Sequence, residues 1–394
     1  MQTVNTDTQT TRNLVQAAEQ LLPTLKARSH EIDQLRHVPQ DLAETLAAQG
    51  FYRICTPAAL GGLDAGPLAL CRACETLAMG NGSVAWCVFI GTTSQYLLGA
   101  LPKSQCETML ADPAVITSGV FADSGTARFE ARDGQPGYII NGHWRWGSGS
   151  HNAAWISGGI HEVDASGTAI DNPKGLTRVF FKPEEIEILD NWHVSGLRGS
   201  GSSDYRAEDV WVASERMAGA VEQGDFADLP IYNFPRFGLL AIPIGAIALG
   251  MARAAIDEVI EIAALKTPQG SRRTLAMRPA LHLDIATADT QLRAARALFY
   301  AEIASAWDTA QTMPGDLEQR SGLRTATVHA VNTAVAVIDK MYTVVGGTSV
   351  FESSCLQQHF RDVHVATQHM MVGEPVMELA GRVLLGLDTA APGL

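Results

Sequence analysis

Apolar residues recur at helical spacing through the first part of the chain. One such run places them at Leu14, Ala17, Ala18, Leu21 and Leu25. A second run, 38–50, ends in Gly50, and glycine often stands just past the last turn of a helix. A long and mostly apolar stretch follows at 67–101. This pattern predicts an N-terminal α-helical domain over residues 1–112.

The pattern changes between residues 113 and 222. Short apolar runs such as GYIINGHW, AAWISGG and TRVFFKP are separated by Gly, Pro, Asn and Asp at short intervals. Such runs are typical of antiparallel strands, so we predict a middle antiparallel β domain over 113–222. The pair Asn141-Gly142 is typical of a two-residue hairpin turn, and we expect the chain to reverse there.

Helical spacing returns in the last part of the chain. Three long, Ala-rich runs lie at 245–266, 279–310 and 321–346. Their apolar stripes are wide enough for mutual packing, which predicts a C-terminal four-helix-bundle domain over 223–394. The stretch 237–252 has no charged residue, but it is shorter than a membrane span and contains Pro243. We interpret it as a buried central helix and expect no membrane partner.

Composition limits what this protein is expected to bind. The 394 residues are 46% hydrophobic and 18% charged, as in ordinary globular proteins, and the formal net charge of −13 argues against nucleic acid as a partner. Cys71 and Cys74 form a lone CxxC pair inside a helical run, so we interpret them as buried thiols and expect no metal site. The polar first residues lack the apolar core of a signal peptide, and we expect a cytoplasmic protein.

The stretch WRWGSGSHNAAWISGGI, residues 144–160, is rich in Gly, Ser and Trp where a strand ordinarily carries β-branched residues. Glycine inside a strand indicates a bulge or the close approach of another body. Ser148 and Ser150 lie between or beside glycines, and their hydroxyls are candidates for contact with a bound group. The chain has no GxGxxG motif, so a nicotinamide dinucleotide on a Rossmann domain is not expected.

Several stretches, in this order, resemble the acyl-CoA dehydrogenase superfamily over nearly the whole chain. They are 50–62 with 75–87, the run WRWGSGSHNAAW, the run LRGSGSSDYRAEDVWV, and VVGGTSVFESSCLQQHFRDVHVATQH near the C-terminus. The resemblance implies that superfamily's fold: a helical domain, a β domain and a helical bundle. The two glycine-rich runs would lie along a flavin, and their glycines would give room to its isoalloxazine ring.

The resemblance also implies which residues hold the flavin. They are Trp146, Ser148, Gly149, Ser150, Arg272, Arg273, Gly346 and Gly347. The two arginines match a loop that reaches the flavin pyrophosphate of a neighbouring subunit, so a homotetramer, a dimer of dimers, is expected. The superfamily's RxxFG pattern is absent here, because TLAM follows Arg273, and this leaves both FAD and FMN open.

One departure from the dehydrogenases bears on the chemistry. Most acyl-CoA dehydrogenases carry a catalytic Glu shortly after the RD pair of a late helix, whereas here VHVATQHMMV follows Arg361-Asp362 and His369 takes roughly the place of the base. Other members use a Glu from an earlier helix, for which Glu258 and Glu261 are the candidates in this chain. We interpret Arg361 and Asp362 as a structural ion pair. The late His and the GSG run resemble the two-component flavin-dependent monooxygenases, whose members oxygenate phenols such as p-hydroxyphenylacetate, indoles or dibenzothiophene. The alternative is an acyl-CoA dehydrogenase with bound FAD.

The monooxygenase branch implies a reaction and its partners. A separate NAD(P)H-dependent flavin reductase would supply reduced flavin, FADH2 or FMNH2. Its reaction with O2 would give a C4a-hydroperoxyflavin that hydroxylates a small aromatic substrate of the phenol or indole type. Ser148, or alternatively Ser150, would hold flavin N5 by a hydrogen bond, and His369, titrating near neutral pH, would act as acid or base. The substrate-binding residues would be Trp86, Phe121, Phe237 and His369.

Overall fold

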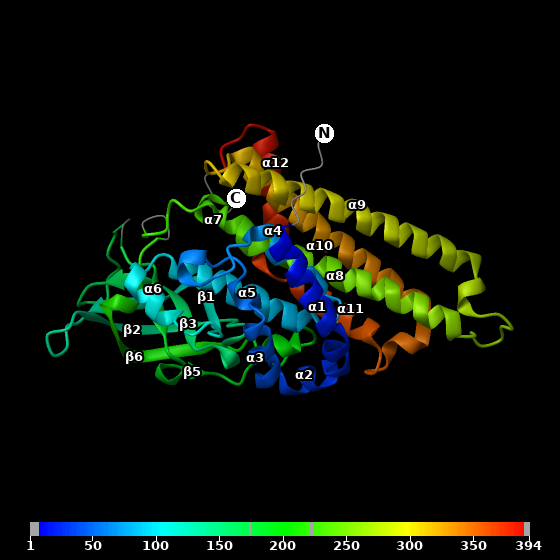
Figure 1. The fold of residues 1–394 in the computed structure, drawn as a ribbon, viewed down its shortest axis with the longest axis horizontal. Helices are drawn as coiled ribbons and strands as arrows, with labels where there is room; N and C mark the ends of the chain where they lie inside the picture. Colours follow the sequence, from blue (N-terminus) through cyan, green and yellow to red (C-terminus); the bar gives the residue numbers. More distant parts are fainter. Residues whose placement is uncertain (1–7, 173–174, 221–223, 390–394) are drawn as a thin grey trace.

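The computed structural model describes residues 8–172, 175–220 and 224–389. The described chain runs through helices, then strands, then helices, as the periodicity predicts. Figure 1 shows the sheet gathered on one side of the molecule and the long C-terminal helices extending away from it on the other. The predicted boundary at 112/113 falls between a helix and a strand, and the predicted boundary at 222/223 lies outside the described residues.

The N-terminal part consists of helices, one of which is almost wholly buried. They are α1 (Gln9–Ala27), α2 (Ser29–Leu35), α3 (Gln40–Ala48), α4 (Gly66–Ala78), α5 (Gly82–Leu98) and α6 (Lys103–Met109). Helix α5 is buried along nearly its whole length, and the Asn81 side chain caps its start by accepting the Val84 N–H. Gly50 adopts φ +81° just beyond α3, which confirms the predicted helix end.

The strands form a sheet in the order β5-β6-β2-β1-β3-β4-β7. They are β1 (Thr117–Phe129), β2 (Gly137–Trp144), β3 (Trp155–Val163), β4 (Arg178–Phe181), β5 (Glu187–Ile188), β6 (Tyr205–Ala213) and β7 (Met217–Ala218). The neighbouring strands pair antiparallel, as predicted, except that the central pair β1 and β3 runs parallel. The exception arises because β2 occupies one edge of β1, and the chain then crosses over to the other edge before β3 begins.

The predicted hairpin turn at Asn141-Gly142 is wrong, because both residues lie inside β2. The chain reverses instead at Asp133 and Gly134, which adopt φ +51° and +79° between β1 and β2. Two consecutive residues with positive φ match a type I′ turn, for which Asp-Gly is as suitable a sequence as Asn-Gly.

The C-terminal part is built on three long helices. Its helices are α7 (Pro230–Asn233), α8 (Arg236–Leu265), α9 (Pro279–Ala310), α10 (Leu317–Val345), α11 (Cys355–Ala366) and α12 (Glu374–Leu384). Helices α8, α9 and α10 pack side by side, and α11 packs against α8 and α10. Helix α8 is long and apolar enough to cross a membrane, but 89% of its most apolar 18-residue window is buried. This agrees with the interpretation of a buried central helix, against which α4 and α5 also pack.

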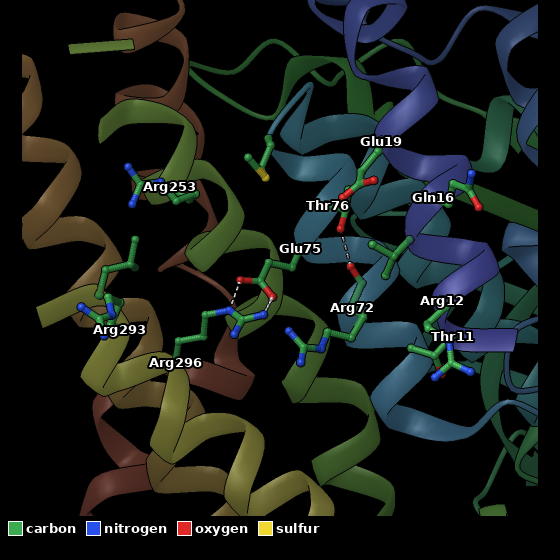
Figure 2. A pocket seen from close by; sticks show the side chains of 13 residues that line it. Thr11, Arg12, Gln16, Glu19, Arg72, Glu75, Thr76, Arg253, Arg293 and Arg296 are labelled. Carbon is green, nitrogen blue, oxygen red and sulfur yellow. Dashed lines mark hydrogen bonds and ion pairs between the residues drawn. The ribbon is translucent and has the colours of Figure 1, made fainter. Parts of the chain in front are cut away.

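A cavity of about 430 Å³ lies between α1, α4, α8 and α9, and Figure 2 shows its arginine-rich lining. Glu75 of α4 accepts hydrogen bonds from Arg296 Nε at 2.6 Å and from the Tyr300 hydroxyl at 2.6 Å, both on α9. Arg253 of α8 pairs with Asp289 of α9 at 2.8 Å. Burial raises the pKa of Glu75 to about 7. The Glu75–Arg296 pair joins the N-terminal and C-terminal helices, and the Arg253–Asp289 pair joins α8 to α9. We therefore assign the cavity a structural role.

Candidate functional site

Two Gly/Ser loops, one following β2 and one preceding β6, are bonded together by their backbones. The Gly147 N–H donates to the Ser203 carbonyl at 2.9 Å, and the Gly149 N–H donates to the Ser200 carbonyl at 2.8 Å. The two runs that the sequence analysis singled out therefore form one surface. Helix α5 supports it, because the Cys87 thiol on α5 contacts the Ser200 carbonyl at 3.5 Å.

The glycines within the strands make room for Trp144. This indole is fully buried and donates to the Gly159 carbonyl at 2.8 Å. A Cβ atom built on Gly125, Gly142 or Gly158 would lie 2.4, 2.6 or 2.5 Å from its ring. At Gly158, the one of these three glycines that lies in the stretch 144–160, the body that approaches the strand is therefore a core side chain. The flavin contact expected of the glycines in the two Gly/Ser runs stays a prediction.

The loop itself needs special backbone conformations. Gly149 adopts φ +73°, and a Cβ atom on Gly147 would lie 2.7 Å from the Tyr205 ring. Trp146 adopts φ +65°, which costs a bulky residue on the order of 1–3 kcal/mol. Its N–H donates to Asp204 Oδ1 at 3.1 Å, which helps to hold this conformation. The Trp146 side chain is 68% exposed, so its indole is available to a ligand.

Ser148 lies at the centre of a buried chain of hydrogen bonds. Trp86 Nε1 on α5 lies 3.1 Å from Ser148 Oγ, which lies 2.6 Å from Ser202 Oγ. Ser202 Oγ lies 2.6 Å from Ser200 Oγ, which donates to the Leu197 carbonyl at 2.7 Å. Sequence reasoning identified the later loop but not Ser200 or Ser202. Their alternation with glycine in GSGS was the available signal.

Ser150 provides a second hydroxyl in the same loop. It is 1% exposed, and its Oγ has no hydrogen-bond partner among the residues that the structure describes. A buried hydroxyl without a partner is costly, and a bound group that supplies one removes the cost. Ser150 is therefore a candidate for contact with the polar edge of a ligand, and its contact with flavin stays a prediction.

His369 lies next to Trp86, with ring centroids 5.8 Å apart in an edge-on arrangement. It follows α11 and begins a 3-10 turn, η10 (Met370–Val372), where its Nδ1 accepts the Met371 N–H at 3.2 Å. Burial, together with the positive charge of Arg324, lowers the pKa of His369 to about 4. The prediction that it titrates near neutral pH is therefore wrong. The neutral ring accepts at Nδ1 and carries its proton on Nε2.

The predicted substrate-binding residues fall into two groups. Trp86 and His369 lie together beside Ser148, whereas Phe121 and Phe237 contact each other with ring centroids 6.0 Å apart. Arg178 lies over the Phe121 ring at 5.0 Å. The structure thus brings Trp86 and His369 together at Ser148. Phe121 and Phe237 form an aromatic pair that packs against the core cluster containing Trp86.

The remaining predicted flavin contacts lie elsewhere on the surface. Arg272 and Arg273 are exposed in the loop between α8 and α9. Gly346 ends α10 with φ +67°, and the space around the Cβ position of Gly347 is open. This exposure is compatible with a contact to a neighbouring subunit, which stays a prediction.

Arg361 and Asp362 do not form the expected ion pair with each other. Arg361 pairs with Asp33 at 3.0 Å, while Asp362 Oδ1 accepts the Leu197 N–H at 2.6 Å. Asp362 is fully buried, and burial raises its pKa to about 7. These two residues therefore tie α11 to α2 and to the Gly/Ser loop, respectively. Within the described ranges, no group of three or more His, Cys, Asp and Glu could hold a metal ion.

Comparison with known proteins agrees with this architecture. The acyl-CoA dehydrogenase N-terminal domain model matches residues 8–111, and the C-terminal domain model matches 242–374. The chain is 30% identical to indole-3-acetate monooxygenase of Pseudomonas putida, over 92% of this chain and 90% of that one. It is 29% identical to the flavin-dependent monooxygenase oxygenase subunit HsaA of Rhodococcus jostii, over 90% and 93%.

The fold is also similar to that of a solved structure, XiaF from Streptomyces sp. in complex with FADH2 and glycerol. The TM-score is 0.89 at 22% identity, covering 98% of each chain. The chain belongs to the acyl-CoA dehydrogenase family. Within that family it is a flavin-dependent monooxygenase, an oxidoreductase.

Proposed function

We propose that this chain is the oxygenase component of a two-component monooxygenase. It takes reduced flavin, FADH2 or FMNH2, from a separate NAD(P)H-dependent reductase and uses O2 to hydroxylate a small aromatic compound of the phenol or indole type. The observation that carries the proposal is the grouping of Ser148, Trp86 and a neutral His369. The resemblance to most dehydrogenases of this family would place a carboxylate base where this chain has the imidazole of His369.

The described residues fit a bound flavin. The unpartnered Ser150 hydroxyl and the accepting Ser148 oxygen offer polar contacts, and the exposed Trp146 indole offers a flat apolar one. When bound, reduced flavin would supply the electrons for O2 activation through a C4a-hydroperoxyflavin. The roles of the chain are to orient the ring with Ser148 or Ser150 and to keep water away with Trp86, which slows loss of hydrogen peroxide.

His369 acts in this proposal as a hydrogen-bond donor. Its Nδ1 is engaged by the Met371 N–H, so the group available to a substrate is Nε2–H. This donor would orient a phenol oxygen or the acceptor edge of another aromatic substrate beside Trp86. A base at this position would need a free ring nitrogen, which the hydrogen bond from Met371 does not leave.

We also propose the homotetramer that the flavin contacts of Arg272 and Arg273 require. Large apolar side chains remain exposed on α9 and near α12, among them Leu283 at 69%, Leu384 at 84% and Leu385 at 75%. Burial of these side chains against another copy would remove their apolar surface from water. Light scattering coupled to gel filtration measures the mass, and a monomer at micromolar concentration contradicts this proposal.

Rapid mixing tests the function directly. The protein is loaded anaerobically with reduced FMN or FAD and mixed with buffer containing O2. We expect a transient absorbance band typical of a flavin C4a adduct. This transient species should live longer on the protein than it does in a solution of free flavin. Featureless reoxidation, together with tight stoichiometric binding of oxidised FAD and bleaching by an acyl-CoA, would overturn the proposal.

A further inference from the structure

The hydrogen bonds that reach Ser148 have a fixed direction. The Leu197 carbonyl can only accept, so the single hydroxyl proton of Ser200 points to it at 2.7 Å. Ser202, 2.6 Å away, must then donate to Ser200. Ser148 must in turn donate to Ser202, also at 2.6 Å. The reverse order would leave Ser200 Oγ and the carbonyl oxygen in close contact without a proton between them.

Leu197, the last acceptor in this series of hydrogen bonds, is held rigidly. The Leu197 N–H donates to the fully buried Asp362 at 2.6 Å, and the Leu197 carbonyl also accepts from Trp192 Nε1 at 3.2 Å. Leu197 adopts φ +49°, a conformation that needs such support in a residue with a branched side chain. The acceptor that sets the direction is thus fixed by contacts from α11 and from its own loop.

We propose that this series of hydrogen bonds makes Ser148 Oγ an obligate acceptor toward the flavin. The protein thereby selects reduced over oxidised flavin, with Ser202 and Ser200 as positioning residues. The inference rests on the proposed function, since it needs flavin N5 to reach Ser148. N5 of reduced flavin carries a hydrogen and can donate to Ser148. N5 of oxidised flavin has only a lone pair, which would face the lone pair of the serine oxygen.

Trp86 shows which type of group the Ser148 oxygen takes. Ser148 is 4% exposed, and the donor now bound to its oxygen is the Trp86 indole N–H at 3.1 Å. A hydroxyl oxygen has two lone pairs, and the indole uses one of them. The N5–H group of reduced flavin is the same type of donor, so it can bond to the second lone pair while the indole keeps its own bond. Oxidised flavin brings no donor to that lone pair, and its own N5 lone pair would face it, which costs binding free energy.

The test compares Ser202→Ala with Ser203→Ala. Both residues are buried in the same loop. The Ser203 hydroxyl contacts His151 at 3.3 Å and takes no part in the series of hydrogen bonds from Ser148 to Leu197. Dissociation constants for oxidised and reduced FMN and FAD are measured anaerobically by fluorescence. Ser202→Ala frees the Ser148 proton to turn toward N5, so we expect the preference for reduced flavin to fall roughly tenfold. Ser203→Ala should retain the preference of the parent.

Two further measurements keep the result clear if Ser202→Ala folds poorly. In Trp86→Phe the Ser148 hydroxyl still donates its hydrogen bond to Ser202, so this variant should keep the preference for reduced flavin. In 5-deazaflavin, position 5 is carbon in both redox states, so the parent's preference for the reduced form should fall by about the same factor as in Ser202→Ala. Circular dichroism melts confirm that each variant is folded.

The outcomes separate this inference from the proposed function. A parent protein that prefers reduced flavin, with the same preference in folded Ser202→Ala and with 5-deazaflavin, overturns the inference and leaves the function standing. A parent that binds oxidised flavin as tightly as reduced flavin contradicts both. An equal loss of preference in Ser203→Ala and Ser202→Ala also overturns the inference. Such a result would show that any change in this loop lowers the preference, whether or not it interrupts the hydrogen bonds from Ser148 to Leu197.

Discussion

The imidazole of His369 lies edge-on to the indole of Trp86, with ring centroids 5.8 Å apart. The same indole donates its N–H to Ser148. Trp86 therefore separates the proposed flavin contact from the proposed substrate contact, and each of the three side chains comes from a different part of the chain. The predictions below test these separate roles.

Replacing His369 should affect substrate conversion more than flavin binding. We expect His369→Ala to lower the rate of hydroxylation roughly tenfold, because one hydrogen bond to the substrate is lost, while His369→Asn keeps a side-chain N–H donor and more of the rate. Because the pKa of His369 is lowered to about 4, the rate should show no histidine limb between pH 5.5 and 8. A limb near pH 6.5 that vanishes in His369→Asn would identify a titrating base instead.

Replacing Ser148 should uncouple oxygen use from product formation. Ser148→Ala removes the accepting oxygen beside Trp86, and we expect the same folded protein with a higher yield of hydrogen peroxide per O2 consumed. Peroxide and hydroxylated product are measured in parallel, with Ser203→Ala as the matched control. Coupling equal to that of the parent would show that Ser148 is not the flavin contact, and Ser150→Ala would then be the next variant to measure.

Adding a methyl group at Gly158 should destabilise the β domain. The new Cβ atom would meet the buried Trp144 ring at 2.5 Å, and overpacking of a tight core costs about 1–3 kcal/mol. The control is Gly381→Ala in α12, where no atom lies within 4 Å and the higher helix propensity of Ala favours stability. Thermal melts of both variants measure the difference. Equal melting temperatures would contradict the packing role of the strand glycines.

Acid should destabilise the protein through His359. This residue is 4% exposed, and burial together with Lys26 lowers its pKa to about 4 from an ordinary 6.5. As the pH falls, the unfolded chain therefore takes up a proton on His359 before the folded protein does. The contribution of neutral His359 to the stability of the folded protein is complete above pH 6.5 and is lost between pH 6.5 and 4. The free energy of unfolding should fall by up to about 1.4 kcal/mol per pH unit from this group. Denaturant titrations at pH 7, 5.5 and 4.5 measure the slope, and His359→Gln should reduce it.

The sequence by itself determined the order of helices, strands and helices, because apolar periodicity reports which face of each element is buried. It also determined the end of α3 at Gly50 and the burial of α8, where backbone conformation and composition are local properties. The Gly/Ser runs were recognisable as a candidate site from local composition alone, because serine between glycines has little use in an ordinary strand.

Only the tertiary structure decided which of these local signals acts where. Asn141-Gly142 and Asp133-Gly134 are equally suited to a turn, and the pairing of β2 along β1 selected the second. The proton on Ser148 points as it does because Leu197, about fifty residues away, ends the hydrogen-bond chain. The pKa of His369 depends on burial and on Arg324, and Asp362 bonds to Leu197 and not to its neighbour. Hydrogen-bond direction, titration and core packing depend on groups far apart in sequence, and only folding brings these groups together.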